Sequence, residues 1–266
     1  MTGHGIDDRL VDGRYARRAQ LGRGGFGIVW RAHDTLLQRD VAMKEVRFPP
    51  ILSPEEQAAL REKVLREARA AARLSHPAVV TVYDVVEEDG RPFIVMELVN
   101  APNLAEMVQR DGPVPEKLAA EIGLAVLGAL TVAHAEGIIH RDVKPANVMV
   151  SATGRVQLAD FGIASIIDDP KVTNSGQLAG SPSFMAPEQA ENRPAGPATD
   201  LWGLGATLYF AVEGEAPFER DGAIPTLTSV LIDEPREIER AKGLAPLLRD
   251  LLRKPPGDRP TVEETR

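Results

Sequence analysis

The sequence predicts an α+β protein with two lobes, a small β-rich lobe that holds one main helix and a larger, mainly helical lobe. Segments rich in β-branched residues occupy Tyr15 to Val46 and recur near 79–86 and 92–98. Beyond "NAPN" at 100–103 the apolar residues follow helical spacing instead. This change of pattern sets the expected division of the chain: an N-terminal tail over 1–14, the first lobe over 15–99 and the second lobe over 100–266.

Each element of the first lobe has a local cause. The segments "IVWRA" (28–32) and "DVAMKEV" (40–46) are expected strands, separated by the turn-like "HDTLLQR". The helix expected over 53–74 has a clear start. Ser53 can cap it, Pro54 suits the first helical position, and Glu56 completes a capping box.

The second lobe begins with a long helix, expected over 115–137. Its apolar residues form a helical stripe that ends at Gly137. A hairpin of "NVMV" and "RVQLAD" follows, and then helical stretches near 197–213 and 244–253. Between them lies a polar segment, about 163–185, and a segment of that length without its own element is usually functional.

The bulk composition narrows the class of protein. The chain has 266 residues, 43% hydrophobic and 26% charged, which is ordinary for a globular protein. A net charge of -8 argues against a nucleic-acid partner, which usually leaves a basic footprint. The chain has no Cys, which excludes disulfides and thiolate metal sites, and its five His show no spacing typical of metal ligands. No apolar run reaches the roughly 18–20 residues that span a bilayer, and no signal peptide opens the chain, so we expect a cytoplasmic domain without a membrane segment.

The stretch "LGRGGFGIV" (21–29) carries Gly22, Gly24 and Gly27 in the pattern GxGxxG. Three interpretations compete: a dinucleotide fingerprint, a hairpin without a role, and a loop that covers phosphates. A dinucleotide site requires a helix after the third glycine, whereas the following "IVW" favours a strand. The spacing therefore favours a β-hairpin whose backbone N–H groups approach phosphates closely, which glycine permits. The hairpin without a role stays open at this point.

Lys44 lies in "VAMK", inside an expected strand with apolar neighbours. A half-buried Lys needs an anionic partner, and the helix that follows offers Glu67 in "LREA". Bound phosphates are a second source of negative charge. The alternative interpretation is an outward surface charge, which is the commoner fate of a Lys in a strand.

The stretch "HRDVKPAN" places Asp142, Lys144 and Asn147 between two aliphatic runs. Charges in such a position indicate a polar loop held by buried strands at a reaction centre. Asp142 can accept a hydroxyl proton, Lys144 can neutralise phosphate charge, and Asn147 can ligate a hard cation through oxygen. "LADFG" then adds Asp160, a second hard oxygen ligand ahead of Gly162.

Taken in order, these motifs resemble the eukaryotic-like protein kinases, specifically the bacterial Ser/Thr kinase branch. The glycine loop, VAMK, the helix glutamate, HRDVKPAN, DFG (160–162), "APE" (186–188), "DLWGLG" (200–205) and "GDRP" follow the order of that family over roughly residues 15–266. Each motif is weak or moderate by itself, but the ordered set is highly specific. The resemblance implies the bilobal protein-kinase fold.

The resemblance also implies roles for individual residues. Asp142 is expected to position the substrate hydroxyl and accept its proton, and Lys144 to offset charge on the transferred phosphoryl group. Asn147 and Asp160 are expected to hold Mg2+, with Mn2+ as the alternative ion. Lys44 is expected to orient the α/β-phosphates of ATP and to pair with Glu67. The residues expected to bind ATP are Leu21, Gly22, Arg23, Gly24, Gly25, Phe26, Gly27, Ile28, Val29, Ala42, Lys44, Glu67, Met96 (the gatekeeper position), Glu97 and Val99.

Further positions match the family in the second lobe. Lys144, two residues after Asp142, and Ser181 in "GSPSFMAPE" are typical of Ser/Thr rather than Tyr kinases. The resemblance implies a buried ion pair between Glu188 and Arg259. It also implies that Asp200 accepts hydrogen bonds from the backbone of the catalytic loop. For all three residues the alternative is an ordinary surface charge.

Two departures from the family pattern affect these expectations. The insert "RFPPILSPEEQ" between Lys44 and Glu67 is longer than usual, which makes Glu62 the second candidate partner of the lysine. The sequence stops at Arg266, one turn into an expected helix at "TVEETR", as at a fragment boundary. Family members often continue into a linker, a membrane span and a sensor domain, so the alternative location is the cytosolic part of a membrane-anchored receptor kinase.

Three functions compete. The first is an ATP- and Mg2+-dependent Ser/Thr protein kinase that phosphorylates itself and other proteins, and family members of this branch often form a homodimer through the small lobe. The second is a pseudokinase scaffold, which commonly lacks one of Lys44, Asp142 and Asp160, all present here. The third is a small-molecule kinase of the aminoglycoside type, against which the APE segment argues. We also expect a regulatory phosphorylation at Thr173 or Ser175, placed to reach Arg141.

Overall fold

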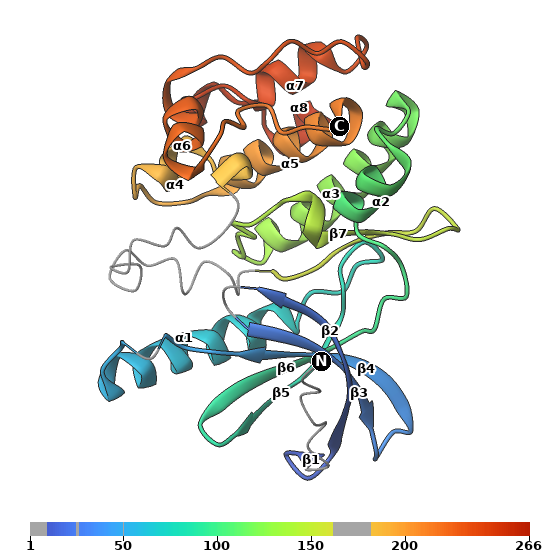
Figure 1. Ribbon diagram of the computed structural model, residues 1–266, viewed down its shortest axis with the longest axis vertical. Helices are drawn as coiled ribbons and strands as arrows, with labels where there is room; N and C mark the ends of the chain where they lie inside the picture. The colour runs from blue at the N-terminus through green and yellow to red at the C-terminus, as the bar shows by residue number, and fades with distance from the viewer. Residues whose placement is uncertain (1–9, 25–26, 50, 162–181) are drawn as a thin grey trace.

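The computed structural model describes residues 10–24, 27–49, 51–161 and 182–266. Figure 1 shows two parts, a sheet accompanied by one long helix and a larger, mainly helical part. We call these parts the N-lobe and the C-lobe. They are the two lobes that the sequence predicts, and the α+β, bilobal class is confirmed.

The N-lobe sheet is antiparallel, with its strands in the order β1-β2-β3-β4-β6-β5. Successive side chains of a strand point to opposite faces, and β4 is buried on both. Val41 and Met43 belong to one hydrophobic cluster, whereas Ala42 and Val46 belong to another, which includes residues of the long helix. Lys44 shares the face of Ala42 and Val46. The strands are β1 (Leu10–Val11), β2 (Tyr15–Gly24), β3 (Gly27–Asp34), β4 (Arg39–Val46), β5 (Val82–Glu88) and β6 (Arg91–Met96).

The helix of the N-lobe, α1 (Pro54–Ala71), starts as the sequence predicts. Ser53 accepts a hydrogen bond from the backbone N–H of Glu56, and the Glu56 side chain accepts one from the backbone N–H of Ser53. This reciprocal cap satisfies two donors, one of them an N–H that a helix start leaves without a partner inside the helix. The buried face of α1 then packs against the sheet.

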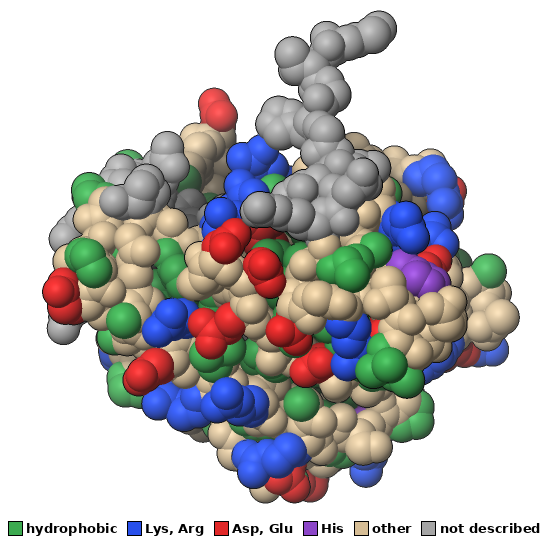
Figure 2. Space-filling model, turned by 90° about the horizontal axis from the view of Figure 1, so that it is seen from below, with side chains coloured by type: hydrophobic (Ala, Val, Ile, Leu, Met, Phe, Trp, Pro, Cys, Tyr) green, Lys and Arg blue, Asp and Glu red, His purple; other side chains and the backbone are tan. Residues whose placement is uncertain are grey.

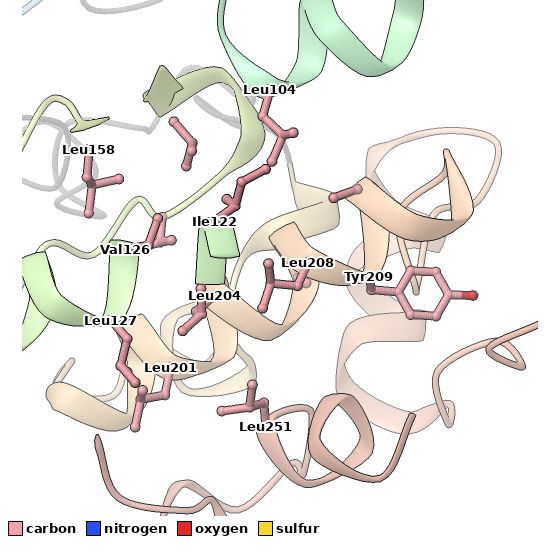
Figure 3. Close-up of a cluster of buried hydrophobic side chains, with 14 of the residues drawn as sticks. Leu104, Ile122, Val126, Leu127, Leu158, Leu201, Leu204, Leu208, Tyr209 and Leu251 are labelled. Carbon is pink, nitrogen blue, oxygen red and sulfur yellow. The ribbon is translucent and has the colours of Figure 1, made fainter. Parts of the chain in front are cut away.

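The C-lobe is built around two long helices, α3 (Glu116–Ala135) and α5 (Pro197–Glu213). Figure 3 shows Ile122 and Val126 of α3 in one cluster with Leu204 and Leu208 of α5. Because α5 is apolar around most of its circumference, it is buried on nearly all sides. The remaining helices are α2 (Leu104–Asp111), α4 (Pro187–Ala190), α6 (Ala223–Ile232), α7 (Ala245–Leu251) and α8 (Val262–Thr265), with 3-10 turns at Pro145–Asn147, Pro182–Phe184 and Pro256–Asp258.

One glycine of α5 sets the distance between this helix and the "HRDVKPAN" loop. A Cβ atom added at Gly203 would lie 2.8 Å from the carbonyl oxygen of Val143, which is closer than such atoms approach. The missing side chain therefore lets the loop rest directly on the most buried helix of the molecule. A larger residue at this position would displace either the helix or the loop.

A short hairpin of the C-lobe is hydrogen-bonded to the segment that precedes the N-lobe strand β5. Its strands, β7 (Val148–Val150) and β8 (Val156–Leu158), pair antiparallel. The backbone N–H of Leu158 donates to the carbonyl of Ala78 at 2.8 Å, and the N–H of Val80 donates to the carbonyl of Leu158 at 3.0 Å. These bonds fix β8 to the segment that leads into the N-lobe strand β5.

Three helices of the C-lobe, α2, α4 and α6, are absent from the sequence prediction. Asn103 caps α2 in a reciprocal capping box with Glu106, so a sequence signal exists inside the stretch that marks the lobe boundary. By contrast, α6 follows Gly222 and has no side-chain cap. Its apolar residues lie on more than one side, which gives a weak helical pattern.

By length and composition alone α3 could cross a membrane, which the sequence analysis does not anticipate. It has 20 residues, with a mean hydropathy of 1.7 over its most apolar window and 44% of that window buried. One such helix is weak evidence, because the core helices of soluble proteins pass the same test. In this structure α3 contributes seven buried residues to the C-lobe core.

Candidate active site

The glycine stretch forms a β-hairpin, with β2 ending at Gly24 and β3 beginning at Gly27. No helix follows Gly27, so the strand that the sequence predicts here is confirmed and the dinucleotide interpretation is excluded. A Cβ atom at Gly27 would lie 1.9 Å from the carbonyl oxygen of Glu45 in β4. Gly27 is therefore required where β3 crosses close to its neighbour. Gly25 and Phe26 lie outside the described residues.

Lys44 is buried, with 8% of its surface exposed, and its Nζ lies 2.8 Å from Oδ2 of Asp160. Strand β4 positions the lysine, and the end of the β7–β8 hairpin positions the aspartate. Burial by itself raises the pKa of Asp160, but Lys44, with His140 and Lys144 further away, holds this pKa below its ordinary value. Asp160 is thus an ionised carboxylate facing an ammonium group across the junction of the lobes.

Glu67 does not take the place expected for it. Among the described residues neither Glu67 nor Glu62 forms an ion pair with Lys44; Oε1 of Glu67 lies 3.7 Å from Nη1 of Arg141. The expected Lys44–Glu67 pair is therefore wrong for this conformation, because Asp160 is the carboxylate nearest the ammonium. Burial raises the pKa of Glu67, and Arg141 counteracts this only in part.

The catalytic-loop residues predicted from "HRDVKPAN" converge on one carboxylate. Nζ of Lys144 lies 2.8 Å from Oδ2 of Asp142. Nδ2 of Asn147 donates to the carbonyl oxygen of Asp142 at 2.8 Å and to its Oδ2 at 3.1 Å. The Asp142 side chain is 25% exposed, so it is held in place and still reaches solvent. Such a carboxylate can accept a proton from a hydroxyl group that docks beside it.

The backbone of this loop is strained, and Asp200 holds it. Arg141 has φ of 67°, the left-handed region that a side chain disfavours. The backbone N–H groups of His140 and Arg141 donate to Oδ2 and Oδ1 of Asp200 at 2.9 and 2.7 Å. Asp200, which is 1% exposed at the start of α5, therefore has the role predicted from the family. Nε2 of His134 lies 2.7 Å from the same Oδ2, a contact that the sequence analysis missed.

His140 links the catalytic loop to Asp160. Its Nε2 lies 2.8 Å from the carbonyl oxygen of Ala159, and its ring packs edge-on against Phe161 with centroids 4.6 Å apart. Asp160 between these two residues has φ of 64°. The ring of a fully buried histidine thus contacts the backbone before a second strained residue and the side chain after it.

The end of β6 and the segment after it join the apolar cluster on one face of the N-lobe sheet. Met96 is 7% exposed and pairs with Ala42 in the sheet, and both join the cluster against which Val29 and Val99 pack. Glu97 donates from its backbone N–H to the carbonyl of Thr81 at 2.8 Å. The expected adenine-binding residues Ala42, Met96, Val29 and Val99 are therefore brought together in one apolar cluster.

The predicted pair of Glu188 and Arg259 is confirmed. Nη1 and Nη2 of Arg259 donate to Oε1 and Oε2 of Glu188 at 2.7 and 2.8 Å, and the two side chains are 0% and 2% exposed. Thr199 donates to Oε1 of Glu188 at 2.8 Å. The remaining arginine donors reach the carbonyl oxygens of Ala198, Arg253 and Lys254. This pair ties the segment that begins at 182 to the C-terminal end of the chain.

Several predicted residues lie outside the described part of the chain. They are Gly25, Phe26, Gly162, Thr173, Ser175 and Ser181. No group of three or more His, Asp or Glu side chains able to hold a metal ion occurs among the described residues. Asp160 and Asn147 nevertheless supply a carboxylate and an amide oxygen, the hard donors that Mg2+ prefers.

Comparison with known proteins agrees with this geometry. Residues 15–266 match the protein kinase domain family. The chain belongs to the protein kinase family.

Three bacterial relatives illustrate the similarity. The chain is 38% identical to the serine/threonine-protein kinase PknA of Mycobacterium tuberculosis over 247 residues, which cover 91% of this chain and 56% of that protein. It is 36% identical to the kinase PkaA of Streptomyces coelicolor, covering 96% of this chain and 49% of that protein. It is 35% identical to the kinase PknL of Mycobacterium bovis, covering 93% and 61%. The chain thus spans about half the length of these relatives.

Proposed function

We propose that this domain is an ATP- and Mg2+-dependent protein kinase that transfers the γ-phosphoryl group of ATP to Ser and Thr hydroxyls. The observation that carries the proposal is the Asp142 carboxylate, contacted by Lys144 and Asn147, together with the Lys44–Asp160 pair. Its relatives are named serine/threonine-protein kinases. Nothing in the site favours the pseudokinase alternative, since Lys44, Asp142 and Asp160 are all present and Lys44 contacts Asp160.

The roles of the residues follow from their positions. Bound Mg2+ would neutralise charge on the phosphates, and Asp160 and Asn147 are the residues that would hold it. Lys44 orients the α/β-phosphates beneath the glycine hairpin. Asp142 positions the substrate hydroxyl and accepts its proton, while Lys144 offsets charge on the transferred group. The adenine lies between the hairpin and residues 97–99, which contribute backbone hydrogen-bonding groups.

One assay tests the proposal. Radiolabelled ATP with a generic protein substrate should give labelled Ser and Thr in the presence of Mg2+ and none when the ion is chelated. Mass spectrometry of the purified domain before and after incubation with Mg-ATP should show added phosphate. ATP binding without any transfer, to the substrate or to the domain itself, would instead support the scaffold alternative.

We further propose that phosphorylation at Thr173 or Ser175 activates the enzyme. The support is the position of Arg141 directly before the catalytic Asp142, since a phosphate is a strong, charge-assisted partner for a guanidinium and can order a loop. A phosphate that engaged Arg141 would leave Glu67 available to Lys44. The Thr173→Ala/Ser175→Ala double mutant should therefore be slower after Mg-ATP treatment; equal rates would exclude these two sites as the switch.

A homodimer through the N-lobe is a further proposal. Leu36 and Leu37 are 71% and 55% exposed beside Asp34, whose carboxylate accepts from both of their backbone N–H groups. Arg14 bridges Asp34 and the partly exposed Asp84, so apolar and oppositely charged groups share one area. Figure 2 shows the N-lobe end of the molecule, where hydrophobic side chains lie among charges of both signs.

Such an area suits pairing with its own copy, because each charge can meet its opposite across a two-fold axis. Leu37→Asp should abolish any dimer seen by analytical ultracentrifugation. Leu124→Asp, at a C-lobe position that is 52% exposed, is the matched control and should leave the dimer intact. Equal effects of the two changes would contradict an N-lobe interface.

We place the domain in the cytoplasm, where its nucleotide substrate is available.

A further inference from the structure

Gln157 is a buried amide that the proposed mechanism does not use. It lies in the middle of β8 and is 2% exposed. Its Nε2 donates to Oε2 of Glu97 at 2.9 Å. Glu97 directly follows β6, in the segment that passes from the N-lobe to the C-lobe, so this hydrogen bond joins the lobes.

The Gln157 side of this contact is rigid. The backbone N–H of the next residue, Leu158, donates to the carbonyl of Ala78, and its carbonyl accepts from the N–H of Val80. A shift of β8 would therefore break two backbone hydrogen bonds. Two residues beyond Leu158 lies Asp160, the partner of Lys44. One short strand therefore presents an amide to the linker between the lobes and a carboxylate to the lysine.

Two side chains reach the Glu97 carboxylate, and they differ in what they can contribute. Nη2 of Arg155 lies 3.3 Å from Oε1, but the Arg155 side chain is 53% exposed. Exposed ion pairs contribute little, because water screens them and ordering a long side chain opposes them. The Gln157 amide is buried and donates to a group that bears a full charge, which makes a stronger hydrogen bond. The amide is therefore the stronger of the two side-chain contacts to the Glu97 carboxylate, while the backbone N–H of Glu97 donates to the carbonyl of Thr81.

We propose that Gln157 is a positioning residue for nucleotide binding. By holding the Glu97 carboxylate it fixes the backbone of residues 97–99, against which the purine ring binds, at a set distance from Asp160. This inference rests on the proposed function, which assigns the nucleotide to that backbone. The alternative is that the hydrogen bond only satisfies a buried amide and contributes to folding alone.

Gln157→Leu keeps the approximate shape of the side chain and removes the donor. We expect the KM for ATP and the dissociation constant for ADP to rise on the order of tenfold, the effect of losing a hydrogen bond to a charged group. The kcat value should stay within about twofold, because this binding is equal in the ground and transition states. Arg155→Gln is the matched control on the same carboxylate and should change neither constant more than about twofold.

A double-mutant cycle with Glu97→Met completes the test. If Gln157 acts through Glu97, the double mutant binds ADP no more weakly than the weaker single mutant. Additive losses, or a Gln157→Leu protein that melts earlier yet binds ADP like wild type, would overturn the proposal. Calorimetry with ADP needs no turnover, so a domain that binds ADP but transfers no phosphate would disprove the proposed function and still test this one.

Discussion

The Glu188–Arg259 pair, which we call the C-lobe anchor, and the junction of the lobes both contain carboxylate–cation pairs. The two regions differ in whether each cation has the carboxylate partner that the family pattern predicts. Glu188 and Arg259 make two hydrogen bonds below 3 Å inside one packed lobe. At the junction Lys44 contacts Asp160, and Glu67 lies 3.7 Å from Arg141. Both regions were expected to hold a pair fixed by the family pattern.

The difference follows from the number of alternatives available to each cation. Arg259 is enclosed, and the carbonyl oxygens of Ala198, Arg253 and Lys254 occupy its remaining donors. Lys44 is within reach of a strand-end carboxylate on the C-lobe, while its expected partner sits on the N-lobe helix. The expected Lys44–Glu67 pair lies within the N-lobe and is not formed, because a carboxylate of the C-lobe contacts the lysine. At the junction the choice of partner therefore depends on the relative position of the lobes, whereas the enclosed Arg259 has one carboxylate partner.

The largest effect is expected in the part of the site that is already assembled. Asp142→Asn should reduce kcat on the order of 10³-fold and leave ATP affinity nearly unchanged, because the carboxylate accepts the substrate proton and does not hold the nucleotide. Single-turnover kinetics with a nucleotide-binding titration would measure both. Turnover near the wild-type rate would remove Asp142 from the catalytic role.

At the junction, Lys44→Met should come close to abolishing transfer, on the order of 10²-fold in kcat or more, since the α/β-phosphates lose their positioning cation. Weak nucleotide binding should persist. The control is Arg31→Met in β3. Arg31 forms an exposed ion pair with Asp40 that does not involve Lys44, so this change should leave kcat unaltered. An unchanged kcat in the Lys44 variant would make this lysine a structural charge.

Breaking the Glu188–Arg259 pair should destabilise the folded state. Arg259→Leu leaves the Glu188 carboxylate buried without its cation, which should lower the free energy of unfolding by about 3–5 kcal/mol. Arg193→Leu breaks the exposed pair with Glu191 and should cost about 0–1 kcal/mol. Urea unfolding of both variants compares them, and similar losses would mean that burial does not distinguish the two pairs.

The sequence predicted much of this molecule because several signals agree locally. The cap at Ser53, the strand after Gly27 and the stripe of α3 each depend on neighbours in the chain, and all are present. The convergence of Lys144 and Asn147 on Asp142 also follows from short spacing within one loop.

What the sequence did not predict depends on contacts between distant segments. The partner of Lys44, the contact of His134 with Asp200 and the hydrogen bond of Gln157 to Glu97 join residues that no local pattern connects. The helices α2, α4 and α6 were missed for another reason, since short helices depend on tertiary packing more than on their own propensity.

A last prediction extends the comparison to a buried carboxylate on the outer side of the N-lobe. Nε and Nη2 of Arg14 donate to the two carboxylate oxygens of Asp34 at 2.8 and 2.7 Å. These bonds lower the pKa of Asp34 to about 2; burial opposes the shift, and the backbone N–H groups of Leu37 and Leu36 add to it. Like Arg259 and Glu188, this pair lies within a single lobe.

A lowered pKa means that the pair stabilises the folded state fully above the unfolded value of about 3.9, and that this stability is lost as the pH falls toward 2. The shift corresponds to about 2–3 kcal/mol. Asp34→Asn should therefore lower the free energy of unfolding at pH 6 and by about half as much at pH 3, measured by urea titration. Asp40→Asn, at a carboxylate that is 37% exposed, should show a smaller difference between the two pH values. An Asp34→Asn loss that is the same at both pH values would show that shape, and not the charge of the pair, holds this corner of the N-lobe.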